Sequence, residues 1–447
     1  MTNTSNNRST VAIITMFFIF AMISFVTNMA APFGNIWGFK YAWAGMAGNL
    51  MNFTAYLFMG IPAGNMLIRY GYKKTALIAL AVGAIGLFIQ LLSSMVGGDV
   101  VVIGGEHPTT LNLFIYLLGA LVCGFCVCML NTVVNPMLNL LGGGGNRGNQ
   151  LIQTGGALNS LSGTLTPMFV GMLVGTLTKE TTMASVAPLV VTGIIIFVLA
   201  FVIISFVKIQ EPQANLSNVK YEHSPLAFRH CTLGVIAIFF YVGVEIGIPA
   251  ELNAWISRES FEGAAAVAGS LAALYWLLML CGRSLSSVIS GKVSTRIQLI
   301  VASSVAIALI LIAILLPESI TFKSPQIDAL NITSGEVPLK TLFIFLTGIC
   351  TSVMWGGIFN LATEGLGKYT PKASGLFMTM VVGGGIMPYI QDWIARELGG
   401  GSFGYISSYW LVLAMLVYIL YYALIGSKNV NKDIPVDLVD ELEEELV

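Results

Sequence analysis

Long uninterrupted apolar segments recur along the whole 447-residue chain, and they limit its fold more than any other feature of the sequence. A bilayer core about 30 Å thick is crossed by about 20 apolar residues in helical conformation. The predicted spans are 11–36, 44–67, 73–96, 110–140, 150–175, 185–207, 231–256, 265–290, 297–316, 340–366, 373–395 and 404–425. We therefore predict an all-α membrane protein with twelve transmembrane helices.

The composition supports helical spans rather than other membrane architectures. A transmembrane β-barrel alternates polar and apolar residues over segments of about ten residues, whereas these segments are continuously apolar. Hydrophobic residues make up 56% of the chain and charged residues only 10%, against about 25% charged in soluble domains. The N-terminus carries one positive charge and no evident cleavage site, which favours an uncleaved first helix over a signal peptide.

Lysine and arginine residues are distributed unequally between the two sets of predicted loops. If both termini are cytoplasmic, fourteen of them lie on the cytoplasmic side and six on the other, while Arg283 falls within a span. Short cytoplasmic loops retain positive charge. We therefore predict a multi-pass protein of the cytoplasmic (inner) membrane, with both termini in the cytoplasm.

A polar stretch with two prolines and mixed charges divides the chain near its middle. We predict an N-terminal six-helix bundle (1–207), a cytoplasmic linker (208–230), a C-terminal six-helix bundle (231–426) and an acidic cytoplasmic tail (427–447). For the tail, a solvated end is expected over a docking role. Six plus six spans around such a linker resemble the layout of the major facilitator superfamily, in which two six-helix bundles enclose a central cavity.

The loop after the second span resembles the signature loop of that superfamily. The matching positions are Gly64, Arg69, Gly71, Lys73 and Lys74. The aspartate that is usual in this loop is Ile68 here, so its gating ion pair is expected to be missing or rebuilt.

Four pairs of segments resemble the L-fucose:proton symporter family, which also contains glucose/galactose permeases. They are NMAAPF with IPAG, MLNTVVNPMLNLLG with LNSLSGTLTP, YVGVEIG with CGR, and IFNLATEGLG with VVGGGIMP. These segments follow the family's order and cover both halves of the chain. The chain is identified as a divergent member of that family, which implies import of a neutral monosaccharide by alternating access.

Two acids of that family are amides in this chain. The resemblance implies that an aspartate in the first helix and a glutamate in the fourth serve proton coupling and sugar binding, and Asn28 and Asn131 stand at those positions. An amide carries no proton in the physiological range but pairs well with a hydroxyl. Interhelical pairing is the alternative role, and we expect sugar contact for both. For Asn135 we expect structural pairing, because Pro136 frees a nearby carbonyl.

The same resemblance provides the other candidate sugar contacts. Gln153 lies one turn before Gly156, where the family has a glutamine, and Asn159 matches a family asparagine, with a structural role equally open. Trp355 stands at a family aromatic position, where a ring can stack on the face of a pyranose. Asn360 lies in the matching IFNLATEGLG segment.

Glu245 is the carboxylate predicted nearest to the middle of the membrane, which makes it the candidate proton carrier. Burial favours the neutral form of a carboxylate, as a carrier working near neutral pH requires. Sugar binding and a permanent ion pair with Arg283 are equally open roles. Arg69, Lys73 and Glu364, like Arg283, are predicted to serve gating or structure.

Three classes of function compete at this point. We expect a secondary transporter, with proton symport and passive uniport both open; a non-transporting sugar sensor is the second class. A membrane enzyme is disfavoured, since no H-E-x-x-H motif, paired catalytic carboxylates or serine–histidine arrangement lies within the spans. We expect no cofactor or metal, a monomer, and as partners the sugar, protons in the symport case and membrane lipids, without nucleic acid.

Overall fold

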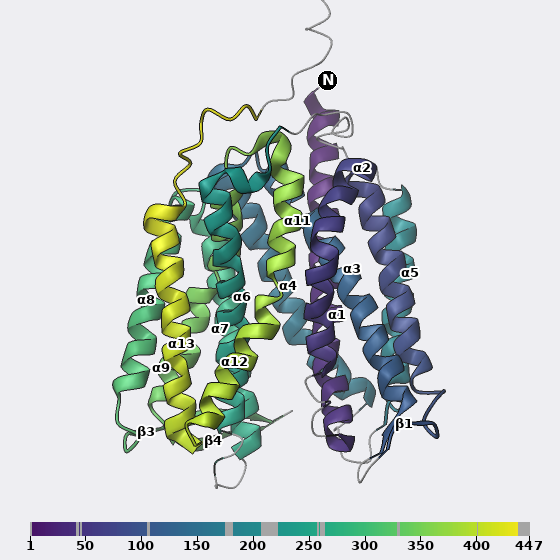
Figure 1. The fold of residues 1–447 in the computed structure, drawn as a ribbon, viewed down its shortest axis with the longest axis vertical. Coiled ribbons are helices and arrows are strands. Elements are labelled where there is room, and N and C mark those ends of the chain that lie inside the picture. Colours follow the sequence, from purple (N-terminus) through teal and green to yellow (C-terminus); the bar gives the residue numbers. More distant parts are fainter. Residues whose placement is uncertain are drawn as a thin grey trace, which may run out of the picture.

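The structure is a computed structural model. It describes residues 2–41, 44, 47–104, 108–174, 182–206, 222–256, 259, 264–328, 331–399 and 401–436. Within these ranges nearly all of the chain is helical, and the strands form two small antiparallel hairpins, β1–β2 and β3–β4 (Figure 1). The predicted linker falls mostly, and the acidic tail in large part, outside the described residues.

The first half of the chain contains five long helices and one small hairpin. These elements are α1 (Thr2–Lys40), α2 (Ala47–Leu92), β1 (Val101–Ile103), β2 (Thr109–Thr110), α3 (Leu111–Leu141), α4 (Gly145–Val174) and α5 (Ala187–Phe206). α2 consists of two arms that meet at Gly71, where φ is +78°. Glycine adopts this left-handed conformation without steric cost. The chain turns back there, so Gly48 near one end of α2 and Gln90 near the other both lie beside Tyr116 of α3.

The second half repeats the pattern with more interruptions. Its elements are η3 (Pro225–Ala227), α6 (Arg229–Ile256), α7 (Ala264–Ile289), α8 (Thr295–Leu315), β3 (Thr321–Asp328), β4 (Asn331–Pro338), α9 (Lys340–Thr351), α10 (Met354–Thr363), η4 (Gly367–Tyr369), α11 (Thr370–Met380), α12 (Gly383–Glu397), α13 (Gly401–Tyr421) and η5 (Tyr422–Gly426). The predicted spans 340–366 and 373–395 each contain two helices, α9 with α10 and α11 with α12. Each break lies beside adjacent glycines, which weaken a helix locally.

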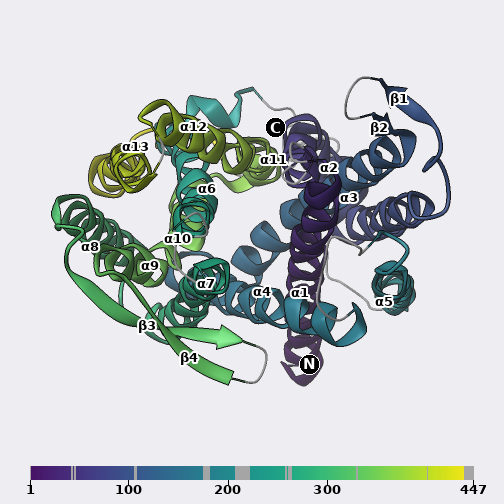
Figure 2. The same cartoon turned by 90° about the horizontal axis from the view of Figure 1, so that it is seen from below.

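The helices account for the predicted number of crossings. Ten helical segments in the described chain are long and apolar enough to span a membrane. α2 turns back at Gly71 and supplies one more crossing, and α4, which is not among the ten, passes between α1 and α7 (Figure 2). The crossings then number twelve, which confirms the all-α, twelve-helix prediction.

The two halves lie side by side as bundles (Figures 1 and 2). Both hairpins lie at one end, which we call the hairpin end, and the start of α1 lies at the other, which we call the terminal end. α3 begins beside β2 at the hairpin end, so its turn into α4 lies at the terminal end. The halves approach closely where Gly60 and Gly64 of α2 meet Gly375 of α11; a Cβ on Gly375 would lie 2.6 Å from the Gly60 carbonyl oxygen.

Candidate functional site

A buried arginine in the last third of α7 (Ala264–Ile289) connects the two halves. Arg283 of α7 donates from Nη2 to Oε1 of Glu245 in α6, at 2.9 Å. Its Nη1 donates to Oγ of Ser160, at 2.7 Å, and to the carbonyl oxygen of Gly156, at 3.2 Å, both in α4 of the first half. The side chains of Arg283 and Glu245 are only 11% and 13% exposed. One guanidinium therefore holds a carboxylate of its own half and two neutral acceptors of the other.

The ion pair is short and is largely shielded from water, so its charges are poorly solvated. A hydrogen bond between ionised partners is about twice as strong as a neutral one. Removing either partner of a buried pair leaves an uncompensated charge, at a cost of about 3–5 kcal/mol. The contact between α7 and α4 thus depends on the charge of Glu245.

Asn131 lies on α3, and the NH2 group of its side-chain amide makes a hydrogen bond. Its Nδ2 donates to the hydroxyl of Tyr56 in α2, at 3.0 Å, and both side chains are buried. Among the described residues no group donates to its Oδ1, which leaves an acceptor that suits a hydroxyl. The side chain of Asn28 in α1 lies outside the described part of the structure.

Asn135 and Trp355 join the halves directly. The indole Nε1 of Trp355 in α10 donates to Oδ1 of Asn135, at 3.0 Å, while Nδ2 of Asn135 donates to the carbonyl oxygen of Asn131, at 2.9 Å. Pro136 lacks an N–H and so leaves the carbonyl of Thr132, four residues earlier, without its helical partner. That carbonyl accepts from Oγ of Ser374 in α11, at 3.3 Å.

Two more of the amides predicted to contact the sugar, Gln153 and Asn360, also reach the opposite half. Nε2 of Gln153 in α4 donates to the carbonyl oxygen of Val353, at 3.0 Å. Nδ2 of Asn360 in α10 donates to Oδ1 of Asn139, at 3.1 Å, and to the carbonyl oxygen of Gly145, at 2.9 Å. Asn159 is half-buried on α4, one residue before Ser160.

The other predicted gating residues make contacts inside their own halves. Arg69 is exposed and lies over the ring of Tyr70, and Nζ of Lys73 donates to the carbonyl oxygen of Ser205 in α5, at 2.8 Å. Glu364 is exposed at the end of α10, where its carbonyl accepts from a ring nitrogen of His230 in α6, at 2.9 Å.

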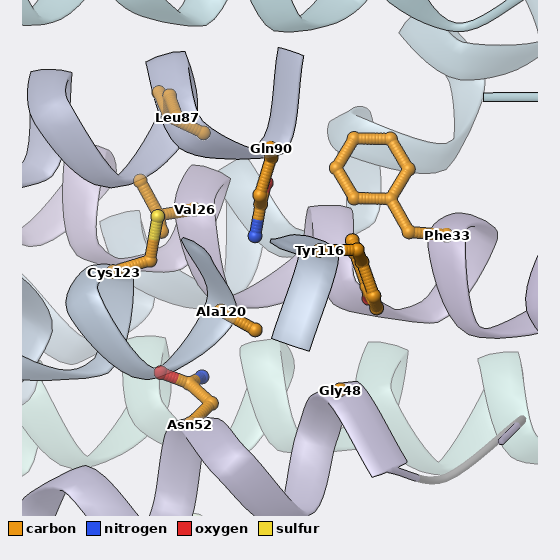
Figure 3. A pocket seen from close by; sticks show the side chains of 9 residues that line it. All are labelled: Val26, Phe33, Gly48, Asn52, Leu87, Gln90, Tyr116, Ala120 and Cys123. Atoms are coloured by element: carbon orange, nitrogen blue, oxygen red, sulfur yellow. The ribbon is translucent and has the colours of Figure 1, made fainter. Parts of the chain in front are cut away.

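A separate small cavity lies inside the first half, between α1, both arms of α2, and α3 (Figure 3). Asn52, Gln90 and Tyr116 point into it, and Oδ1, Oε1 and the hydroxyl of these three residues are buried without partners among the described residues. Its volume is about 10 Å³, which holds about one water molecule. It is too small for a sugar.

Sequence reasoning missed Tyr56 and Ser160, the partners of Asn131 and Arg283. Ser160 lies in the LNSLSG segment and could have been found there as the neighbour of Asn159. Tyr56 is an aromatic residue in an apolar span, and nothing in the sequence distinguishes it from a packing residue.

The motifs and this geometry agree with comparisons to known proteins. The model of the Major Facilitator Superfamily matches residues 11–388, and the chain belongs to that superfamily. It is similar to a glucose/galactose transporter of Brucella abortus, with 28% identity over 425 residues and 93% of each chain covered. A putative glucose/galactose transporter of Helicobacter pylori is 27% identical over 440 residues, covering 96% of this chain and 99% of the other.

The fold is also similar to that of solved transporter structures. A variant of the E. coli fucose:proton symporter FucP superposes with a TM-score of 0.73 at 18% identity, covering 94% of this chain and 100% of that one. The superfamily predicted from the motifs is thus confirmed, and the similarity to glucose/galactose transporters and to the fold of a fucose:proton symporter agrees with the resemblance drawn from them.

Proposed function

We propose that the protein is a secondary transporter that imports a neutral monosaccharide of the fucose, glucose or galactose kind, coupled to protons through Glu245. Support for the substrate class comes from relatives named as glucose/galactose transporters along 93% of their length, and from the fold of a fucose:proton symporter. The observation that carries the coupling proposal is the set of bonds from Arg283 to Glu245 in one half and to Ser160 and Gly156 in the other.

These bonds suggest how a proton could change the conformation. When Glu245 is ionised, its charge compensates the guanidinium and holds Arg283 between α6 and α4. When Glu245 takes up a proton, the buried guanidinium loses its counter-charge and that arrangement becomes less stable. A local change of charge can bias an element that has two arrangements, here the contact between the two bundles. The proton bound at Glu245 would then cross with the sugar and be released on the other side.

We propose Asn131 as a sugar contact. Its free Oδ1 can accept from a sugar hydroxyl while Tyr56 keeps the amide oriented. The ring centroids of Trp355 and Tyr241 are 6.2 Å apart. Trp355 offers an aromatic face on which a pyranose can stack. Asn28, Gln153, Asn159 and Asn360 remain candidate sugar contacts.

We place the terminal end in the cytoplasm of a cell whose inner membrane holds the protein. Three basic residues are exposed at that end: Arg147 in the first turn of α4, Lys292 after α7 and Lys428 after η5. Positive charge of this kind is retained on the cytoplasmic side. The hairpins β1–β2 and β3–β4 would then face outward.

The coupling proposal is tested by reconstituting the Glu245→Gln variant in proteoliposomes and measuring uptake of radiolabelled sugar. We expect loss of uphill accumulation under a proton gradient, while exchange of labelled for unlabelled sugar survives, because a fixed neutral side chain still lets the loaded carrier reorient. Glu251→Gln is the matched control, since Glu251 is a second buried carboxylate on α6. Accumulation that survives in Glu245→Gln would overturn the coupling role, and saturable binding without exchange in the wild type would indicate a sensor.

A further inference from the structure

Three asparagines form a row on α3, and two of them bond to the second half of the molecule. Asn131, Asn135 and Asn139 are spaced four residues apart, so they lie on one face of the helix, about 6 Å from one another along its axis. The last two lie near the end of α3 that carries its turn into α4, at the terminal end. This end is where the chain lacks the aspartate of its superfamily's gating loop, because Ile68 occupies that position.

The amides of Asn135 and Asn139 are bonded to side chains of α10. Asn135 accepts from the indole of Trp355, and Asn139 accepts from Asn360, at 3.0 and 3.1 Å. Asn139 also donates from Nδ2 to Oγ1 of Thr363, at 3.4 Å. Apart from Trp355, the side chains in this set are less than one-tenth exposed.

The start of α4 extends the same set of contacts. Nδ2 of Asn149 donates to Oγ of Ser290 at the end of α7, at 3.0 Å. Oδ1 of Asn146 accepts from the backbone N–H of Thr295, at 3.3 Å, where α8 begins. All of these groups are uncharged, and each bond joins the first half to the second at the terminal end.

We propose that the bonds of Asn135 and Asn139 to Trp355, Asn360 and Thr363 form a neutral latch that holds the terminal end closed, in place of an ion-pair gate. This proposal deepens the proposed transport cycle, because the latch must open for sugar to leave at that end. It differs from the Glu245–Arg283 pair in having no titratable group, so its strength does not depend on pH. Trp355 and Asn360 then serve the latch as well as being candidate sugar contacts, because their N–H groups donate to Asn135 and Asn139 whenever this end is closed.

The amide pairing explains why asparagine suits these positions. A buried ion pair must be desolvated again in each cycle, and a separated buried charge is costly. A separated amide in a wetted opening finds water as a partner, and each such bond shifts an equilibrium by only about three- to tenfold. Several weak neutral bonds close the end firmly yet release one after another.

The test measures the closure directly and needs no sugar. Spin labels at Arg147→Cys and Lys428→Cys, both exposed at the terminal end, report the distance between the halves by pulsed electron resonance, in a Cys281→Ser background that removes the exposed native thiol. Asn139→Leu removes two bonds of the latch at once. We expect it to raise the population with the terminal end open by about tenfold or more, equally at pH 6 and pH 8.

Asn112→Leu is the matched control, because Asn112 lies on the same helix at the hairpin end, where its Oδ1 accepts from Oγ1 of the nearby Thr110, at 2.6 Å. We expect wild-type distances for it. The double variant Asn139→Leu with Asn360→Leu should open the end by less than the product of the single effects, since the two residues share a bond.

Thr363→Val, which removes a single bond, serves if Asn139→Leu does not fold, and it should open the end about threefold. Wild-type distances in a folded Asn139→Leu protein, or single effects that multiply fully in the double variant, would overturn the latch. A failure of sugar transport or of proton coupling would leave these distance measurements unaffected, so the two proposals fail separately.

Discussion

At the residue scale, amides stand at Asn28 and Asn131, where the resembled family carries acids, while Glu245 and Arg283 form a buried ion pair. Asn131 pairs with Tyr56 and keeps one acceptor free, whereas the charge lies on Glu245 and Arg283. A hydrogen bond can be made by either kind of group, but a proton is carried only by the carboxylate. We therefore propose that the amide recognises the sugar and that the carboxylate carries the proton.

Asn131→Leu tests the recognition part of that assignment. Leucine has a similar volume but offers no acceptor, so a sugar hydroxyl would be buried without a partner. We expect sugar affinity to fall by about one to two orders of magnitude, equivalent to about 1.5–3 kcal/mol. Binding is measured by calorimetry on the purified protein, beside Tyr56→Phe, which also breaks the Asn131 bond but keeps the acceptor. Unchanged affinity in a well-folded Asn131→Leu protein would make Asn131 a structural residue.

At the element scale, the helices were predictable and their interruptions were not. Long apolar runs are required by the bilayer, so all twelve crossings could be read from the sequence. The hairpin β3–β4 lies in a stretch that carries Pro325 and little apolar alternation, which does not predict strands. The breaks between α9 and α10 and between α11 and α12 fall inside continuous apolar runs, where hydropathy carries no information about local bends.

The contact between α2 and α11 gives a prediction at this scale. A Cβ on Gly375 would meet backbone atoms of Gly60 and Gly64 at 2.6–3.1 Å, and backbone cannot yield as a flexible side chain can. Gly375→Val should therefore keep the terminal end from closing and lower the initial rate of uptake by about tenfold, in line with the cost of overpacking.

Gly269→Val on α7 is the matched control, because a Cβ at Gly269 meets no described atom within 4 Å. Its uptake rate should equal that of the wild type. If both variants transported at the same rate, close approach of α2 and α11 would not be needed for transport.

At the scale of the whole molecule, the motifs were enough to predict the family, but the pairing of residues across the halves was not. Trp355 and Asn360 were expected to face a sugar, and here their donors reach Asn135 and Asn139 of the opposite bundle. Such partners are separated by more than 200 residues in sequence and meet in only one of the arrangements that a carrier adopts. A single sequence specifies the residues on a face but not which partner they meet in a given state.

The central claim is that sugar and protons move together through this protein. It is tested most directly by adding sugar to a lightly buffered suspension of de-energised cells or vesicles that contain the wild-type protein, and recording the external pH. We predict alkalinisation on addition of a transported sugar, and none with Glu245→Gln, although that variant still exchanges sugar. Saturable sugar entry into the wild type without any proton movement would contradict the account and leave a passive sugar uniporter.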